Sequence, residues 1–409
     1  MTKPKYPTYA QRGALLAAAQ KLKMARSVHA YVRGSTINFY EWLEEAPGGA
    51  VPEGPPVWIC GDCHVGNLGP VADAKGRIAI QIRDVDQTVI GNPAHDLIRL
   101  GLSLATAARG SDLPGVTTAQ MLEHMVEGYK EAMAPDADAE TRDVPDAVVS
   151  VMEKAYHRHW RHLAEERLED VEPSIPLGKH FWPLSADEKE AIEALCDSEP
   201  VRKLITSLHS RKKDASVQML DAAYWMKGCS SLGRLRYAVL VRVAGGKKDS
   251  DMCLLDIKEA LHAAAPKSDV NASTHDMPAD SAERVVAGAQ ALSPYLGNRM
   301  LAAKLLDKPV VLRELMPQDL KLEIDQLTRD EAVKAARFLA RVVGRAHARQ
   351  MDRATREQWM AELARHRSMA LDAPSWLWSS VVELLGTHEA AYLHHCRQYA
   401  LEPARAAAE

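Results

Sequence analysis

Two short apolar runs near the start of the chain each lead into a group of carboxylate and amide side chains. Residues 57–60 (VWIC) precede residues 61–67 (GDCHVGN), and residues 77–82 (RIAIQI) precede Asp84-Val85-Asp86. Apolar runs of this length, with polar residues at their ends, are typical of short buried strands. Loops fixed by strands are where proteins commonly place binding and catalytic side chains. The sequence therefore predicts a functional site in this region.

The residue types in these two groups suit phosphoryl transfer with a divalent metal. Asp62 and Asn67 are five positions apart on a turn-rich segment, so a short loop can direct both toward one phosphate. A carboxylate can accept the proton of an attacking hydroxyl, and Mg²⁺ prefers hard oxygen ligands. Asp84 and Asp86 add two carboxylates at the end of a strand. Ordinary turn residues and a pair of solvated strand-end acids are the alternative interpretation.

Charge and composition restrict the class of protein. The chain has 51 Lys and Arg against 55 Asp and Glu, a formal net charge of −4, which argues against non-specific nucleic-acid binding. No run approaches the roughly 18 apolar residues of a membrane-spanning helix, and the N-terminal residues lack the apolar core of a signal peptide. The six Cys are expected to be reduced thiols. We therefore expect a cytoplasmic protein without nucleic-acid or membrane partners, and composition leaves its oligomeric state open.

Hydrophobic periodicity divides the chain into helical and strand regions. Apolar residues at i, i+3 and i+4 predict helices over residues 8–33, 94–109 and 281–292, and over most of 115–215 and 329–400. Strands are predicted at residues 57–60, 77–82, 224–243, 252–258 and 309–315. These segments predict an α+β chain in four parts, namely an N-terminal helical segment (1–56), a part that contains the two polar groups (57–215), a small part rich in strands (216–320) and C-terminal helices (321–409).

The polar groups also resemble a known branch of enzymes. The pattern G-D-x-H-x-x-N at 61–67, followed by I-x-D-x-D at 82–86 and G-x-P-x-x-D-L at 91–97, resembles the catalytic segments of aminoglycoside phosphotransferases and choline kinases. The resemblance implies that Asp62 is the catalytic base, that Asn67 and Asp84 bind Mg²⁺, and that Asp86 is an additional ligand. It further implies that Asp96 is a buried acid that holds the catalytic loop through backbone amides, with His64 of the motif in a supporting role. Cys60 departs from this branch, which usually has His there.

A candidate nucleotide-binding part follows these segments instead of preceding them. Residues 227–233 (KGCSSLG) form a turn in which Gly228, Ser230, Ser231 and Gly233 are expected to approach phosphates. Lys258 resembles the kinase Lys that contacts the α- and β-phosphates, and Glu283 in the next helix resembles its ion-pair partner. Residues 309–315 resemble the strand leading to the hinge, where adenine would bind. An ordinary hairpin and a solvated Lys on an edge strand are the alternatives.

This order of parts, with three short phrases, resembles a bacterial family. The phrases are Val32-Arg33-Gly34, residues 60–69 (CGDCHVGNLG) and residues 344–349 (GRAHAR). On these residues the chain is identified as a member of DUF2252, a family of unknown function, over about residues 20–355. The resemblance implies a protein-kinase-like, two-lobed fold that is circularly permuted and mostly helical, with a small antiparallel sheet in the nucleotide lobe. Arg33 is expected either to contact a phosphate or to cap a helix, and His347 to line or brace the site.

The resemblance implies an ATP- and Mg²⁺-dependent phosphotransferase whose acceptor is an unknown hydroxyl, on a small molecule rather than a protein. Two alternatives share the fold: a nucleotide-binding pseudokinase that regulates a partner, and a kinase-like nucleotidyltransferase. A zinc site at Cys60, Cys63 and His64 is disfavoured because no second pair of ligands has suitable spacing. His157, His159 and His162 are interpreted as a solvated helix surface.

Overall fold

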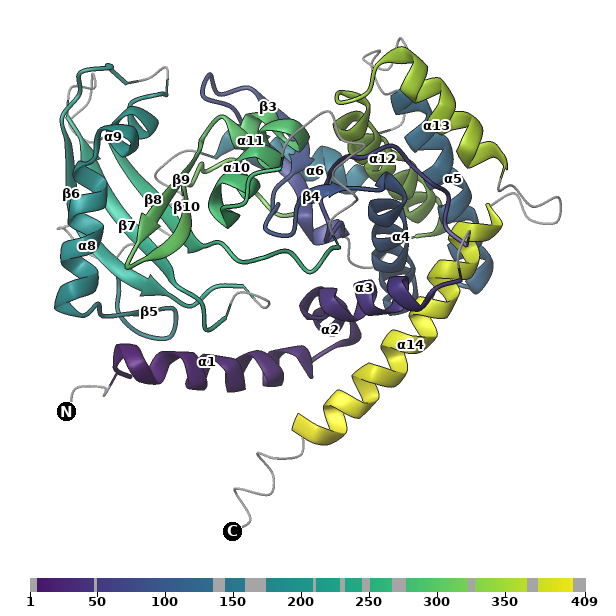
Figure 1. The fold of residues 1–409 in the computed structure, drawn as a ribbon, viewed down its shortest axis with the longest axis horizontal. Coiled ribbons are helices and arrows are strands. Elements are labelled where there is room, and N and C mark those ends of the chain that lie inside the picture. The colour runs from purple at the N-terminus through teal and green to yellow at the C-terminus, as the bar shows by residue number, and fades with distance from the viewer. Residues whose placement is uncertain are drawn as a thin grey trace.

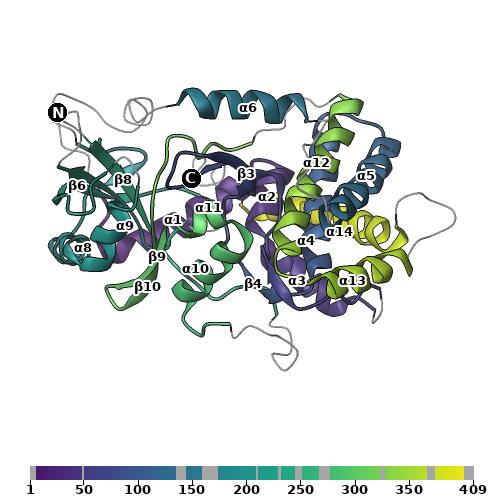
Figure 2. The same cartoon turned by 90° about the horizontal axis from the view of Figure 1, so that it is seen from above.

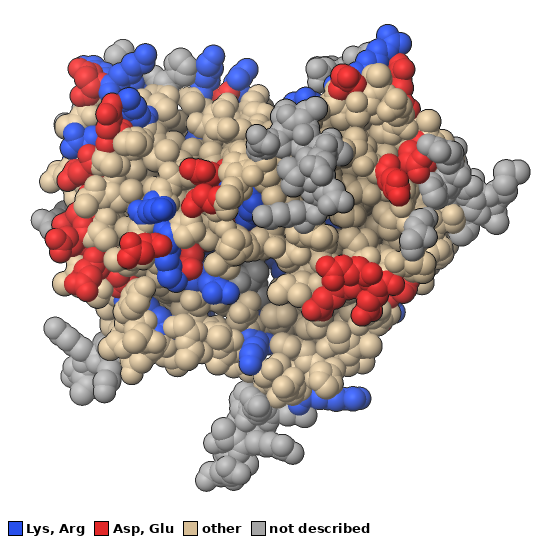
Figure 3. Space-filling model, in the orientation of Figure 1, with Lys and Arg blue, Asp and Glu red and all other residues tan. Residues whose placement is uncertain are grey.

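The structure is a computed structural model that describes residues 6–47, 50–134, 144–158, 174–208, 211–228, 232–244, 251–266, 277–322, 328–365 and 374–399. It is an α+β fold with two parts, a six-stranded antiparallel sheet with its covering helices and a larger helical part (Figure 1). In the space-filling view a notch separates the two parts at one edge of the molecule (Figure 3). None of the helices described combines the length and the apolar character that crossing a membrane requires.

The six-stranded sheet is covered on both faces. Its strands are β5 (Phe181–Trp182), β6 (Val217–Trp225), β7 (Arg236–Val243), β8 (Asp251–Glu259), β9 (Met300–Leu305) and β10 (Lys308–Glu314), in the order β5-β6-β7-β8-β10-β9. One face packs on α1 (Tyr9–Met24), α8 (Ala186–Asp197) and α9 (Glu199–Ile205). On the other face α10 (Ser281–Leu292), which connects β8 to β9, shares a core with Val311 of β10. Burial on both faces explains why β7 is apolar along nearly its whole length.

The helical part is assembled from both ends of the chain. Its helices are α2 (Val28–Gly34), α3 (Thr36–Glu45), α4 (Pro93–Gly110), α5 (Gly115–Met133), α12 (Arg329–Ala348), α13 (Arg353–Arg365) and α14 (Ser375–Tyr399). Helix α6 (Asp146–His157) runs along one side of the molecule (Figure 2), and the short α11 (Pro294–Gly297) follows α10. Two small antiparallel sheets lie where the parts meet, β1 (Val57–Ile59) with β4 (Val89–Gly91), and β2 (Leu68–Ala72) with β3 (Ile78–Ile82).

Helix α1 connects the two parts. Arg12 on α1 is buried against the sheet, where it donates a hydrogen bond to Glu188 of α8 at 2.6 Å and lies over the ring of Tyr224. At the other end of α1, Tyr392 of α14 donates to the carbonyl oxygen of Ala25 at 3.1 Å. The N-terminal helix is thus fixed to the sheet at one end and to the helical part at the other.

Most predicted elements are present, and the α+β class is confirmed, but several boundaries differ. The single helix expected over residues 8–33 is wrong, because the chain bends between α1 and α2, where the Ser27 hydroxyl caps α2 by accepting from the Ala30 amide. Strands β2, β4, β5 and β9 were not predicted. Strand β5 pairs with β6, and α8 and α9 pack on the sheet, so the part of the chain that forms the sheet and its covering helices begins before residue 216. Residues 245–250, which join β7 to β8, lie outside the described residues.

We expect Gly128→Ala to destabilise the fold. An added Cβ at Gly128 on α5 would lie 2.1 Å from the backbone carbonyl oxygen of Arg337 on α12. Because this atom belongs to the backbone, rotation of a side chain cannot remove the clash. Overpacking of this kind costs about 1–3 kcal/mol. Urea unfolding measures the loss. The control is Gly386→Ala on α14, which meets nothing within 4 Å and is expected to be neutral or to stabilise by up to about 1 kcal/mol. Equal stabilities of the two variants would contradict the close packing of α5 on α12.

His388 makes stability depend on pH. It is 2% exposed on α14, and burial, followed by the charge of Arg99, lowers its pKa to about 4. An unfolded His has a pKa of about 6.5, so the unfolded chain binds the extra proton first. The contribution of His388 is therefore complete above pH 6.5 and falls as the pH drops toward 4, by about 2 kcal/mol at pH 5. We expect His388→Gln to reduce the loss of unfolding free energy between pH 7 and pH 5 by this amount. The exposed control His394→Gln is expected to keep the full loss, and an unchanged loss in His388→Gln would contradict the assignment.

Candidate active site

The loop that carries Asp62 is held by Asp96, on the first turn of α4. The Asp96 carboxylate accepts hydrogen bonds from the backbone amides of Cys60 at 2.7 Å and Gly61 at 3.0 Å. His347 of α12 lies 3.1 Å from the same carboxylate, and since a carboxylate only accepts, Nε2 of His347 is the donor. Tyr129 then faces Nδ1 of His347 at 2.9 Å. Asp96 and His347 are fully buried, so these contacts have no competition from water.

A glycine sets the turn between β1 and Asp62. Gly61 has a φ of +75°, a conformation that favours glycine. A Cβ at this position would also lie 2.1 Å from the backbone oxygen of Gln87. The Asp62 loop and the segment that follows Asp86 are therefore in backbone contact, and no larger residue fits between them.

Asp62 is oriented by its neighbours. Nη2 of Arg99 donates to Oδ1 of Asp62 at 2.5 Å, and Nδ2 of Asn67 donates to the Asp62 carbonyl oxygen at 3.0 Å. Nε2 of His64 lies 3.8 Å from Oδ2 of Asp62. Burial lowers the pKa of His64 to about 3, with the Asp62 charge opposing this and Arg33 and Arg99 adding to it. His64 is therefore neutral near pH 7, and the buried Arg99 supplies the positive charge beside Asp62.

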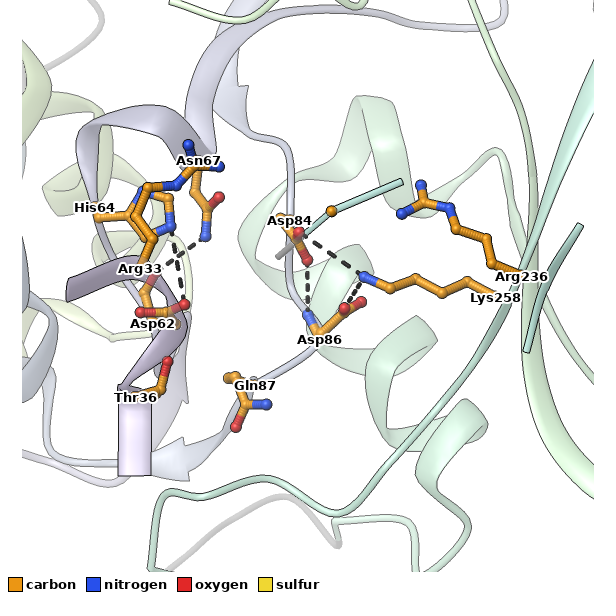
Figure 4. A pocket seen from close by; sticks show the side chains of 11 residues that line it. Arg33, Thr36, Asp62, His64, Asn67, Asp84, Asp86, Gln87, Arg236 and Lys258 are labelled. Carbon is orange, nitrogen blue, oxygen red and sulfur yellow. Dashed lines mark hydrogen bonds and ion pairs between the residues drawn. The ribbon is translucent and has the colours of Figure 1, made fainter. Parts of the chain in front are cut away.

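Asp84 and Asp86 face Lys258 of β8 across the junction of the two parts (Figure 4). Nζ of Lys258 forms an ion pair with Asp86 and lies 3.9 Å from Oδ2 of Asp84. Burial raises the pKa of Asp84, but Lys258, Arg313 and Arg236 outweigh it and hold the pKa below its ordinary value. The same cations that would attract a phosphate thus keep this carboxylate ionised.

These side chains line one cavity. Its wall is formed by the candidate base, the candidate metal ligands, the Lys of the sheet, and parts of the N-terminal helices and of the turn after β6: Arg33, Thr36, Asp62, His64, Asn67, Asp84, Asp86, Gln87, Gly228, Arg236 and Lys258. The cavity spans about 580 Å³, part of it open to solvent. Arg33 on α2 lies against Gly66, where a Cβ would be 3.4 Å from the centre of its guanidinium group. Its Nε is buried and has no partner among the described residues.

A magnesium ion fits this donor set. Asn67 and Asp84 offer an amide and a carboxylate oxygen at one cavity, and Asp86 lies beside them. The described residues contain no cluster of three or more His, Cys, Asp or Glu suited to a metal. A site of one or two carboxylates is nevertheless characteristic of Mg²⁺, which completes its coordination with water and substrate phosphates.

Other predicted residues lie elsewhere. Glu283 is exposed on α10 and is not beside Lys258 in the structure, where Asp86 occupies that role. The next residue, Arg284, is buried and donates to the backbone oxygens of Asp86 and Leu261 at 3.0 Å and 2.7 Å. Gly233 packs toward α1 and does not line the cavity, whereas Gly228 does. Ser230 and Ser231 lie outside the described residues.

Side chains of the protein occupy the position beside residues 309–315 where the resemblance implies that adenine would bind. Leu315, which follows β10 at the predicted hinge, is buried in a cluster with Ile175, Phe181 and Trp225. The rings of Phe181 and Trp225 are stacked with centroids 5.7 Å apart. A base could enter beside Leu315 only if this cluster opened.

Sequence reasoning missed three charged residues of the site. Arg99 was detectable in principle, because it is three positions after Asp96 and therefore shares a face of α4. Arg236 and Asp256 form a buried two-point ion pair, at 2.9 Å and 2.6 Å, next to Lys258. Their proximity follows from the pairing of β7 with β8, which places Arg236 opposite Lys258 and which no local pattern specifies.

We expect Asp96→Asn to destabilise the chain by about 2–4 kcal/mol in urea unfolding. The amide has one acceptor oxygen in place of two, so a buried backbone N–H or His347 loses its partner. Asp187→Asn is the matched control, because Asp187 also lies in the first turn of a helix but is exposed. It is expected to lose no more than the helix-dipole contribution of about 1 kcal/mol. Similar losses in both variants would show that Asp96 does not anchor the loop.

Comparison with protein families gives one match, and it covers nearly the whole chain. The matching family model is described as an uncharacterized protein conserved in bacteria (DUF2252), and it spans residues 13–398. Comparisons with curated proteins and with solved structures gave no match. The matched region includes the Asp62 loop, Asp84, Asp96, Lys258 and His347, and the chain therefore belongs to the DUF2252 family.

Proposed function

We propose that this chain is a phosphotransferase that moves a phosphoryl group from ATP to a hydroxyl group, with Mg²⁺ held by Asn67 and Asp84. The observation that carries the proposal is the convergence of Asp62, Asn67, Asp84 and Lys258 on one cavity, although Lys258 comes from the other part of the fold. A carboxylate base, oxygen ligands for a metal and a cation for the phosphates form the set that phosphoryl transfer requires.

The architecture supports a permuted, two-lobed, kinase-like arrangement. Along the chain, the pair β6 and β7, the Lys258 strand β8, the helix α10 and the strand β10 follow one another as the resemblance implies. The helices that surround the Asp62 loop come from two segments of the sequence. Helices α4 and α5 precede the strands of the sheet along the chain, and α12 and α14 follow them. This is the connectivity expected if the helical lobe is encoded in two pieces.

In the proposed reaction Asp62 orients the acceptor hydroxyl and takes up its proton. Arg99 occupies Oδ1 of Asp62, so Oδ2 faces the hydroxyl. The hydroxyl oxygen bonds to the γ-phosphorus, the bond from that phosphorus to the β–γ bridging oxygen breaks, and ADP leaves. Lys258 and Arg33 provide positive charge for the phosphate oxygens, and bound Mg²⁺ supplies further neutralisation of the same charge.

Two contacts must change before this reaction. Lys258 has to leave Asp86 to meet a phosphate, and Ile175 and Phe181 have to move for a base to lie beside Leu315. The pairing of Lys258 with Asp86 favours the second candidate, a nucleotide-binding regulator without turnover, because it holds Lys258 away from a phosphate. A thermal shift with ATP and Mg²⁺, followed by a measurement of ATP consumption, separates the two, because the regulator binds without consuming ATP.

We expect Asp62→Asn and Asp84→Asn each to reduce ATP turnover by at least about 100-fold, since the first removes the proton acceptor and the second a charged metal ligand. Formation of ADP with Mg²⁺ measures turnover. Urea unfolding of each variant checks that the fold is retained.

The matched control is Asp197→Asn, whose side chain is 72% exposed at the end of α8 and far in sequence from the site. It is expected to keep wild-type turnover. Full turnover in Asp84→Asn would refute the metal assignment, and full turnover in Asp62→Asn would refute the proton acceptor.

A further inference from the structure

A second cavity adjoins the first at the ion pair between Lys258 and Asp86. It shares Asp84, Asp86, Arg236 and Lys258 with the first cavity, and it spans about 400 Å³, part of it open to solvent. Its additional charged residues are Arg83, Asp256 and Arg313, and Leu296, Met300 and Val311 form its apolar wall. Figure 4 shows Lys258 reaching toward Asp84 and Asp86, with Arg236 beside it at this boundary.

Two arginines in this cavity are only weakly paired with carboxylates: Arg83 has no carboxylate partner among the described residues, and Arg313 has one long contact, with Asp256 at 3.5 Å. Nη2 of Arg83 donates only to the backbone oxygen of Asp319, at 3.0 Å, and its Nε is buried without a partner. The Asp319 carboxylate is already bound by Arg299, at 3.1 Å and 3.0 Å. Nη1 of Arg313 donates to the backbone oxygen of Arg83 at 3.2 Å. Arg313 thus contacts the backbone of Arg83, and the two residues line the same cavity.

Two acids of the cavity, Asp256 and Asp86, are already paired with cations that line it. Asp256 receives both hydrogen bonds of its ion pair from Arg236, and only a longer contact of 3.5 Å joins it to Arg313. Asp86 is paired with Lys258, and Asp84 faces Lys258 from the first cavity. Burial lowers the pKa of Arg83 to about 10, with Asp319 opposing this and Arg313 and Arg33 adding to it, which indicates repulsion among these cations.

We propose that Arg83 and Arg313 form a second anion site, which takes the phosphate group of a small molecule. Its chemistry follows from two guanidinium groups, which match the oxygens of a tetrahedral anion, and from an apolar wall that strengthens their attraction by excluding water. An anion bound there also meets Lys258, which lines the same cavity together with Asp86. It therefore competes with Asp86 for Lys258. The coupling to the reaction rests on the proposed function, whereas the anion site itself does not.

The test uses the full chain without ATP or metal, at constant ionic strength. Inorganic phosphate is titrated calorimetrically, and we expect Arg313→Gln and Arg83→Gln each to weaken binding at least 10-fold. Arg313→Lys keeps the charge but loses the planar guanidinium group, so it is expected to weaken binding less than Arg313→Gln does, and urea unfolding of each variant separates loss of the site from loss of the fold. The matched control Arg242→Gln changes an exposed arginine of the neighbouring strand β7 and is expected to bind phosphate as the wild type does.

Two further variants locate the bound anion. Arg33 and Asp62 line the first cavity and not the second, so Arg33→Gln and Asp62→Asn are each expected to keep the phosphate binding that depends on Arg83 and Arg313. Loss of binding in Arg33→Gln with wild-type binding in Arg313→Gln would overturn the proposal, because the phosphate would then occupy the first cavity. Binding of glycerol phosphate with the same dependence on Arg313 identifies a phosphate ester as the ligand, and binding of inorganic phosphate alone identifies the free anion. Failure of ATP turnover leaves all of these binding measurements unaffected.

Discussion

One buried carboxylate, that of Asp96, holds together the segments from which the candidate site is built. It accepts the amides that precede Asp62 and meets His347, which comes from the opposite end of the chain. A buried amide without a partner costs about 1–3 kcal/mol, so the loop cannot shift without losing stability. The position of Asp62 therefore depends on residues that are distant in sequence, and the two pieces of the helical part must fold together before the site exists.

The charged side chains of the site are largely paired with one another. Most of its acids already face a cation, Asp62 with Arg99, Asp86 with Lys258 and Asp256 with Arg236. In each pair the carboxylate and the cation compensate one another's charge, so no charge in these pairs is left without a partner, which would be strongly destabilising. A phosphate that binds Lys258 must therefore displace Asp86. The affinity of such a ligand is therefore reduced by the free energy needed to break the existing ion pair.

Local patterns predicted much of this structure, and long-range pairing accounts for the rest. The Asp62 loop and the acids after β3 were singled out because turns and strand ends leave a short-range signal, whereas Asp96 was singled out by the resemblance alone. The expected partner Glu283 was placed by its position in a helix alone, and the structure turns it to solvent and buries the adjacent Arg284 instead. Strand β5 is two residues long, and the ion pair of Arg236 with Asp256 depends on strand register, so neither has a periodicity that the sequence can reveal. The break between α1 and α2 was missed because its residues also suit a helix, and a serine cap decided it.

Helix α1 has a consequence for how the two parts can move. The described elements pass between the parts at three places, from α1 to α2, from α6 to β5 and from β10 to α12. A single connection would let one part rotate as a rigid body about a hinge, whereas three connections leave few such rotations open. The buried contact of Arg12 with Glu188 adds a further restraint at the far end of α1. Exchange of ligands in this molecule is therefore expected to proceed by rearrangement of side chains and short segments, within a frame that keeps its overall shape.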